Sequence, residues 1–365
     1  MLLLIVLLAC TPTPDTGADT GPSEAPFVAP DQDGPWLPGT YEDLAPGPEG
    51  LELSVQVWFP ASEADEDLYE YEGYFSAAAL EDGVPACDEP RPVLMFSHGN
   101  TGLRFQSVFL TERLATRGWV VVAPDHKYNT YIDYDEDKLG EVMFRRPLDI
   151  ATSFDWLVQT AAGPGGPLEG CVDEAAGYAV AGHSFGGFTS VAVAGAVIDP
   201  LAVADYCAGN GGWLCSETAA WALEHPGEVA DLGDPRVWAS VPMAPAGYEA
   251  LIGGLADITI PGLVLGGSMD TTTSMVAQVR PIFEGWAGRP AFMGEVADAG
   301  HYSFSNACDL VPTFDDCEPP FIEGAEAHAI INIVTTAFLG QAMGDERYDA
   351  WLPPDDERLQ WTVGE

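Results

Sequence analysis

A predicted strand and a predicted helix, residues 178–182 and 185–197, are joined by the stretch Gly182-His183-Ser184-Phe185-Gly186-Gly187. A serine at the centre of such a sharp reversal is held in a strained conformation with its hydroxyl pointing outward. A larger residue at Gly182 or Gly186 would clash with the neighbouring strand and helix. Ser184 is therefore our candidate nucleophile, and the following helix directs its positive dipole end at any anion formed there. The alternative is a serine in an ordinary packed turn.

Outward from this turn, short apolar runs alternate with helical patterns. We predict strands at residues 51–59, 92–97, 119–123, 178–182, 237–243, 262–266 and 291–296. We predict helices at residues 105–117, 146–160, 185–197 and 325–343, the second with Pro147 in its first turn. This alternation favours an α/β fold with a mainly parallel central sheet and helices on both faces. The acidic stretch at residues 63–72 is expected to be a solvated excursion.

Two N-terminal segments are expected to stay outside the folded domain, which we place at residues 41–365. Residues 1–10 are interpreted as a signal peptide, because their apolar run is far shorter than the roughly 20 residues that span a bilayer. The sequence Leu7-Leu8-Ala9-Cys10 resembles a bacterial lipoprotein box, which implies a lipid on Cys10. Residues 11–40 are rich in Pro, Gly, Asp and Thr and are expected to form a flexible linker. An ordinary cleaved signal with an incidental cysteine is the alternative.

The charge balance limits which partners the chain takes. The sequence has 57 acidic and 13 basic residues, so its formal net charge is −44. A surface this negative repels nucleic-acid phosphates and anionic lipid headgroups. We therefore expect no nucleic-acid partner, and membrane contact only through a lipid on Cys10. The expected location is outside the cytoplasm, as a membrane-anchored lipoprotein of the periplasm or cell surface, or otherwise as a secreted protein.

Six cysteines follow Cys10, an even number that favours disulfides in an exported chain. Two pairs are close enough in sequence to close short loops, and one pair is then left: Cys207 with Cys215, Cys308 with Cys317, and Cys87 with Cys171. Other pairings stay open from the sequence alone, and buried free thiols are the alternative. No Cys-x-x-Cys or paired His-Cys spacing occurs, so no zinc site is expected.

A serine hydroxyl needs a base to take its proton, and the base needs a carboxylate to orient it. His301 follows the predicted strand at 291–296, whereas the other histidines lie in the strand-to-helix turns, in the final helix, or in segments without a late strand-end loop. Asp270 directly follows the predicted strand at 262–266, which gives the chain order serine, acid, histidine. Asp298 is the competing acid, with a surface carboxylate as its simpler interpretation.

The negative charge that develops on a substrate oxygen needs two preorganised N–H donors. One is expected to be the amide of Phe185, directly after the nucleophile. The other is expected from the loop His98-Gly99-Asn100-Thr101-Gly102, where glycine lets the backbone approach closely and the Asn100 amide is favoured. A purely structural tight turn is the alternative for this loop.

The segment at residues 199–234 lies between the nucleophile helix and the next predicted strand, where we expect a small cap insertion. It contains Trp213 and Trp221 together with the short cysteine loop. Our hypothesis is that these two aromatic side chains roof an apolar acyl pocket. The alternative is ordinary helix packing.

Together these motifs resemble the α/β-hydrolase superfamily, and more narrowly the bacterial predicted dienelactone hydrolases and platelet-activating-factor acetylhydrolase-like serine esterases. Further matching pieces are Val57-Trp58-Phe59-Pro60, Phe96-Ser97-His98-Gly99, Ala123-Pro124-Asp125-His126 and Arg146-Pro147-Leu148-Asp149. The resemblance spans residues 51–349. Dienelactone hydrolases use a cysteine nucleophile where this chain has Ser184. The acid at Asp270 follows a later strand than in the acetylhydrolases, as it does in polyester hydrolases and cutinase-like lipases.

The resemblance implies an α/β-hydrolase fold and a serine carboxylic-ester hydrolase that forms an acyl-enzyme without a cofactor. Its substrate would be a small-molecule, lipid or polyester ester. One alternative is an amidase or acyltransferase with the same three residues. Another is a surface-anchored protein that binds a ligand on this fold without turnover, because a fold does not establish a function.

Two further charged motifs were weighed as sites. The run Asp133-x-Asp135-x-Asp137 is similar to the start of a calcium loop, but Lys138 occupies the glycine position and no glutamate follows at the required spacing. We therefore expect a solvated acidic loop and no metal site. Arg146 and Asp149 are expected to form a structural pair at a helix start, with a role in lining the site as the alternative.

Overall fold

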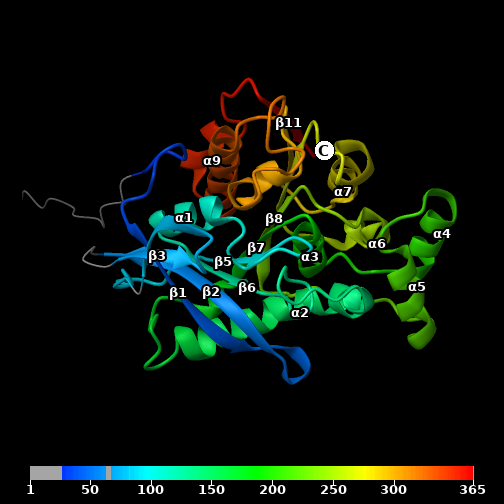
Figure 1. Cartoon of the computed structure of the whole chain (residues 1–365), viewed down its shortest axis with the longest axis horizontal. Helices are drawn as coiled ribbons and strands as arrows, with labels where there is room; N and C mark the ends of the chain where they lie inside the picture. The colour runs from blue at the N-terminus through cyan, green and yellow to red at the C-terminus, as the bar shows by residue number, and fades with distance from the viewer. Residues whose placement is uncertain (1–26, 63–66, 82, 365) are drawn as a thin grey trace, which may run out of the picture.

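The computed structural model describes residues 27–62, 67–81 and 83–364, and Figure 1 shows one central sheet flanked by helices. The predicted signal peptide with Cys10, and residues 11–26 of the predicted linker, lie outside the described residues. In chain order, the strands are β1 (Leu37–Pro46), β2 (Glu52–Ala61), β3 (Leu68–Tyr71), β4 (Phe75–Glu81), β5 (Val93–Ser97), β6 (Val120–Pro124), β7 (Tyr178–His183), β8 (Val237–Met243), β9 (Gly262–Gly267), β10 (Ala291–Val296) and β11 (Leu359–Val363).

The α-helices of the described residues lie mainly between these strands. They are α1 (Val108–Thr116), α2 (Leu139–Trp156), α3 (Phe185–Val193), α4 (Pro200–Asn210), α5 (Cys215–Glu224), α6 (Tyr248–Leu251), α7 (Arg280–Gly285), α8 (Ala307–Leu310) and α9 (Gly324–Ala342). In the ranges 27–62, 67–81 and 83–364, none of these helices combines the length and the hydropathy that crossing a bilayer requires.

The sheet order is β11-β10-β9-β8-β7-β5-β6-β2-β1-β4-β3. The strands from β6 to β10 in this order pair in parallel. β2 joins β6 antiparallel, β1 joins β2 antiparallel, and β11 joins β10 antiparallel. Parallel neighbours bring the carboxyl ends of β5, β7, β9 and β10 to one edge, where ligand sites of such sheets lie. The mainly parallel α/β architecture predicted from the sequence is therefore confirmed.

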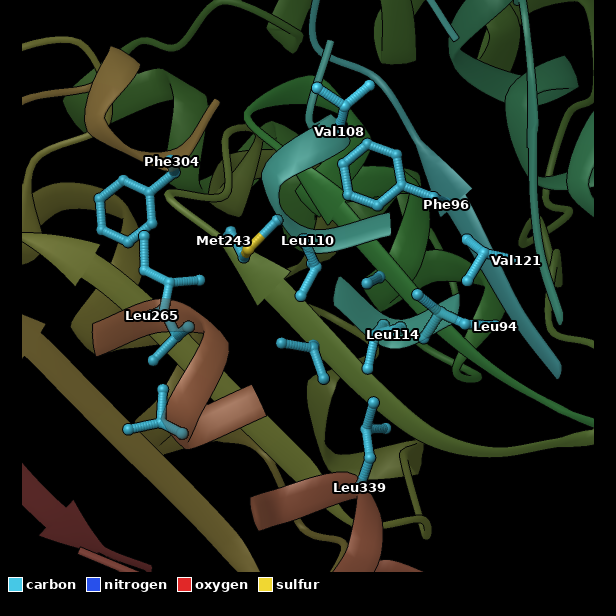
Figure 2. Packing of buried hydrophobic residues seen from close by; sticks show 14 of the residues in the cluster. Leu94, Phe96, Val108, Leu110, Leu114, Val121, Met243, Leu265, Phe304 and Leu339 are labelled. Carbon is cyan, nitrogen blue, oxygen red and sulfur yellow. The ribbon is translucent and has the colours of Figure 1, made fainter. Parts of the chain in front are cut away.

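Both faces of the parallel strands are buried, which explains their almost continuous apolar sequences. In β5, Leu94 and Phe96 face one core cluster, whereas Met95 belongs to the cluster on the opposite face. Figure 2 shows the first cluster, in which Leu114 of α1 and Leu339 of α9 lie with the side chains of the sheet. On the other face, side chains of α2 and α3 share one cluster. Core side chains therefore pack on both faces of the sheet. This packing extends to the edge of the sheet at which β7 is followed by α3.

The predicted linker ends earlier than expected, because residues 37–40 belong to β1, which pairs with β2 over its full length. The segment before β1 also packs on the domain. Arg117 donates hydrogen bonds to the carbonyl oxygens of Val28 and Gln32, at 2.6 and 2.7 Å, and Arg91 lies over the ring of Trp36. The prediction of an unstructured linker is therefore wrong from residue 27 onward. The polar composition of this segment gave no sign that Trp36 packs on Arg91 or that backbone carbonyls accept hydrogen bonds from Arg117.

Two other element predictions need correction. The expected solvated excursion at 63–72 contains β3, in which Tyr69 and Tyr71 are buried and only the alternate residues face solvent. The helix predicted at 146–160 begins earlier, at Leu139, so Pro147 lies inside α2 rather than in its first turn. Proline inside a helix removes one hydrogen bond. The two-sided packing of α2 against the sheet and α5 compensates for that loss.

Three disulfides join the cysteine pairs that the sequence favours. They are Cys87–Cys171, Cys207–Cys215 and Cys308–Cys317, with Cα–Cα distances of 4.8, 6.0 and 5.4 Å. The first connects the segment before β5 to the segment before β7, and the second connects α4 to α5. Disulfides persist in oxidising compartments, so these pairs fit an exported protein.

Removing the long-range disulfide should cost more stability than removing a short one. Its cysteines are 84 residues apart, against 8 for Cys207 and Cys215, and a longer closed loop restricts the unfolded chain more. Replacing Cys87 and Cys171 by alanine should lower the free energy of unfolding by about 4.5 kcal/mol. Replacing Cys207 and Cys215 by alanine should lower it by about 2.5 kcal/mol. Urea denaturation of the oxidised proteins measures both, and the reverse order would contradict the assignment.

Candidate active site

Ser184 lies at the sharp turn between β7 and α3, with φ 59° and ψ −117°. A residue with a side chain in this region stores about 1–3 kcal/mol of strain. Packing explains the two flanking glycines: a Cβ on Gly186 would lie 1.9 Å from the carbonyl oxygen of Ser97, and one on Gly182 would lie 2.2 Å from that of Gly186. The N–H of Ser184 donates to the carbonyl of Met243 at 3.0 Å, which holds the turn against β8. The turn therefore has both the strain and the crowding expected from its sequence.

The structure brings Ser184, His301 and Asp270 together. His301 Nε2 lies 2.9 Å from Ser184 Oγ, and His301 Nδ1 lies 2.9 Å from Asp270 Oδ2. The three residues come from the carboxyl ends of β7, β10 and β9, and each is at most 9% exposed. The competing acid, Asp298, is exposed, and among the described residues the carboxylate that contacts the imidazole is that of Asp270. The order and spacing match a nucleophile, its base and an orienting acid.

The surroundings of Asp270 favour its charged form. Burial alone would raise the pKa of this carboxyl, but hydrogen bonds from His301 and Thr273 bring the pKa below its ordinary value. The N–H groups of Thr272 and Thr273 donate to Oδ1 at 2.7 and 2.8 Å. The Thr273 hydroxyl lies 2.8 Å from Oδ2 and 3.1 Å from His301 Nδ1. Sequence reasoning missed Thr273, although its position three residues after the acid is typical of a carboxylate that caps its own loop.

Two backbone amides of the loop after β5 and of the turn at Ser184 have no acceptor among the described residues. The backbone of Gly99 lies against Ser184, since a Cβ there would be 3.4 Å from Ser184 Cβ. The N–H of Gly99 itself is engaged by Gln106 Oε1 at 3.0 Å. For the amides of Asn100 and Phe185, the structure gives no protein acceptor within its described residues. The amide of Phe185 is unpaired because it opens a helix. These are the two donors expected from the sequence.

Gln106 connects parts of the site that are far apart in sequence. Besides accepting from Gly99, its amide donates to His183 Nδ1 at 3.0 Å, and His183 Nε2 donates to the carbonyl oxygen of His301 at 3.0 Å. Burial lowers the pKa of His183 to about 3, and the nearby His301 adds to this effect. His183 is therefore neutral, which matches its roles as acceptor at Nδ1 and donor at Nε2. The sequence offered no signal for Gln106, because the link depends on tertiary contacts.

A second Ser–His–Asp chain lies behind the loop that carries Asn100. Ser97 Oγ lies 2.9 Å from His126 Nε2, and His126 Nδ1 lies 2.9 Å from Asp149 Oδ2. All three side chains have no exposed surface, so no substrate reaches Ser97. The N–H of His126 also donates to His98 Nε2 at 3.0 Å. This second chain therefore supports the loop from behind and is not a second nucleophile site.

Arg146 and Asp149 were expected to pair at a helix start, and this prediction is wrong. Both lie inside α2, and they bind different partners. Asp149 faces His126, whereas Arg146 donates to Ser97 Oγ and Thr189 Oγ1, each at 3.0 Å, and to the carbonyl oxygen of the residue after Ser97. Burial lowers the pKa of Arg146 to about 9 and raises that of Asp149 to about 7. Because α2 begins at Leu139, both residues lie in the middle of the helix, where they are buried.

The cap segment forms α4 and α5, joined by the Cys207–Cys215 disulfide. Trp213 is 42% exposed, and its ring lies edge-on to that of Phe185 at 4.8 Å. Trp221 instead stacks on Phe144 of α2 at 5.0 Å. Trp221 is therefore a packing residue, as the alternative interpretation held, while Trp213 lies over the residue after the nucleophile.

A cavity of about 320 Å³ opens beside His301, and neither tryptophan lines it. Its walls come from the loop after β9, the loop after β10 and the segment at residues 313–321. The aromatic residues there are Tyr302, Phe314 and Phe321. Sequence reasoning missed this group, although Tyr302 directly follows His301 and so had to lie near it.

Two groups of possible metal ligands among the described residues already have other partners. Within the described ranges, one group of side chains has ligand atoms close enough for a metal, Cys308, Asp316 and Cys317. Both of these cysteines are disulfide-bonded and offer no thiolate. Asp133 of the calcium-like run accepts hydrogen bonds from the Thr130 hydroxyl at 2.6 Å and from its own loop backbone, so its oxygens stabilise that loop.

No protein-family model matches this sequence, and no curated protein matches it either. The function of the site is therefore inferred from its geometry.

Removing the polar end of Gln106 should destabilise the protein. The change Gln106→Met leaves the Gly99 N–H and His183 Nδ1 without partners in a buried site, and each unpaired group costs about 1–3 kcal/mol. The free energy of unfolding in urea should fall by about 2–4 kcal/mol. The matched control is Gln159→Met at an exposed position, which should change stability by less than about 0.5 kcal/mol. Equal stability of the two variants would contradict the linking role of Gln106.

Proposed function

We propose that this chain is a serine hydrolase of carboxylic esters, with Ser184 as nucleophile, His301 as general base and acid, and Asp270 as the orienting carboxylate. The observation that carries the proposal is the continuous hydrogen-bonded chain through these residues, with both distances at 2.9 Å. A serine in an ordinary packed turn would not need the strained backbone of Ser184. In Ser184 this strain is combined with an imidazole within reach, at the edge of the sheet where substrates of such folds bind.

The arrangement of elements supports an α/β-hydrolase fold. The nucleophile follows a central parallel strand on a strained turn, and a second candidate donor comes from the loop after the neighbouring β5. The triad residues follow the chain order serine, acid, histidine, which is the order of that fold. The strand order also reverses around β5, since β6 and β7 lie on its two sides, which creates a switch point at the site.

The geometry accounts for a two-step acyl transfer. Ser184 Oγ attacks the ester carbonyl carbon while His301 Nε2 takes its proton, and the amides of Phe185 and Asn100 bind the oxyanion of the tetrahedral intermediate. The intermediate collapses as Nε2 returns the proton to the leaving alcohol, which leaves an acyl group on Ser184. Water, deprotonated by His301, then attacks the acyl carbon and releases the acid. The carboxylate of Asp270 stabilises the imidazolium in both steps.

The three disulfides support action outside the cytoplasm. We further propose that the chain is exported and held at a membrane by a lipid on Cys10, with an ester of a small molecule, lipid or polyester as substrate. Trp213, beside Phe185, is the residue of the cap segment best placed to contact the acyl part.

The proposal predicts covalent labelling at one serine and ester hydrolysis that depends on it. The wild-type chain should hydrolyse p-nitrophenyl acetate and react with a fluorophosphonate probe. Ser184→Ala should remove the label and lower kcat/KM by at least about 10³-fold, because the nucleophile itself is lost.

Ser97→Ala is the matched control, because Ser97 also lies 2.9 Å from a histidine but is buried. This variant should still be labelled, and mass spectrometry of the wild type should locate the adduct on Ser184. A labelled Ser184→Ala variant, or a wild type without hydrolysis and without labelling, would contradict the proposed function. The second outcome would favour a binding protein on the same fold.

A further inference from the structure

The cavity beside His301 has the histidine in its wall, whereas Ser184 does not line it. In the proposed reaction, His301 Nε2 donates a proton to the leaving oxygen, so the alcohol part of the ester must lie on the imidazole side of Ser184. The cavity has His301 in its wall together with residues of the loop after β9. The amides expected to bind the oxyanion, from Asn100 and Phe185, belong to other loops and do not line it. In the proposed reaction, this cavity is the space on the imidazole side that is available to the alcohol part of the substrate.

The walls of this cavity combine aromatic rings with carboxylates. Tyr302 and Phe314 stack with their ring centroids 4.4 Å apart and an interplanar angle of 21°, and Phe321 lies beside them in the wall. Asp315 and Asp316 follow Phe314 directly in the chain and also line the cavity, whereas no lysine or arginine does. Aromatic faces and carboxylates both attract a positive charge.

Asp316 is held against the loop that carries His301. Its Oδ2 accepts from the N–H of Tyr302 at 2.9 Å, and its Oδ1 is buried without a hydrogen-bond partner. Gly300, the residue before His301, makes room for it: a Cβ there would lie 2.4 Å from Asp316 Cβ. The Cys308–Cys317 disulfide closes the loop that carries the carboxylate. The negative charge is thus held by the fold beside the catalytic histidine, with no protein cation opposite it in the cavity wall.

We propose that this cavity selects esters whose alcohol part carries a positive charge, such as esters of quaternary amino alcohols. The inference rests on the proposed ester hydrolysis and names its substrate class. A quaternary ammonium group is attracted by ring faces and by carboxylates while needing no hydrogen-bond acceptor. A volume of about 320 Å³ is at the lower end of small-molecule sites, which suits a compact alcohol.

A matched pair of substrates tests the charge alone. Acetylcholine and 3,3-dimethylbutyl acetate have the same shape, but the first has a charged nitrogen where the second has a neutral carbon. The wild type should hydrolyse acetylcholine with a kcat/KM at least about tenfold higher, a ratio that cation–π and carboxylate contacts together supply. The variants Phe314→Leu, Asp315→Asn and Asp316→Asn should each lower this ratio. Asp316→Asn keeps an oxygen that accepts from Tyr302, so its fold should be retained.

The general negative charge of the chain requires its own control. Asp257→Asn removes an exposed carboxylate before β9, at the opposite end of this strand from Asp270, and should leave the ratio unchanged. A wild type that hydrolyses p-nitrophenyl acetate but treats the two esters alike would overturn the inference and leave the proposed function standing. A ratio that falls equally in Asp257→Asn and in the cavity variants would also overturn it. A wild type inactive on all three esters would remove the proposed function and this inference with it.

Discussion

The backbone reversal at Ser184 is the constraint on which the rest of the site depends. Its positive φ is maintained because α3 is pressed against the end of β5, so closely that neither Gly182 nor Gly186 has space for a side chain. The same contact places the backbone of Gly99 beside the nucleophile. Strain at a single residue persists only when its surroundings are well determined. Here the sheet, which is packed on both faces, holds the surroundings of Ser184 in place.

The two Ser–His–Asp chains show that hydrogen-bond geometry alone does not define a nucleophile. Ser97 and Ser184 both lie 2.9 Å from an imidazole nitrogen. They differ in backbone conformation and in access, since Ser184 sits on a strained outward turn and Ser97 ends a fully buried strand. The buried chain and the guanidinium of Arg146 hold the loop after β5 from behind.

Much of this arrangement was predictable from the sequence, because its strongest signals are local. Apolar runs predicted both ends of the strands at 237–243 and 291–296 correctly. Ser184, Asp270 and His301 were predicted as site residues because each directly follows a strand or lies in the loop after one. The residues that escaped prediction act through distant contacts. Gln106 lies 77 residues from His183, and Thr273 lies 28 residues from His301. Two strands were missed because of their surroundings: β1 begins inside the segment whose polar composition predicted a linker, and β3 lies in the acidic stretch that was expected to be solvated.

In the proposed reaction Ser184 and His301 act as one unit, and a double-mutant cycle on ester hydrolysis measures this coupling. The single variants Ser184→Ala and His301→Ala and their combination are compared by kcat/KM for p-nitrophenyl acetate. If the imidazole works only through the serine, the double variant should be no slower than Ser184→Ala alone. Losses that multiply across the two positions would mean that the residues act independently, and the account of this site would then be wrong.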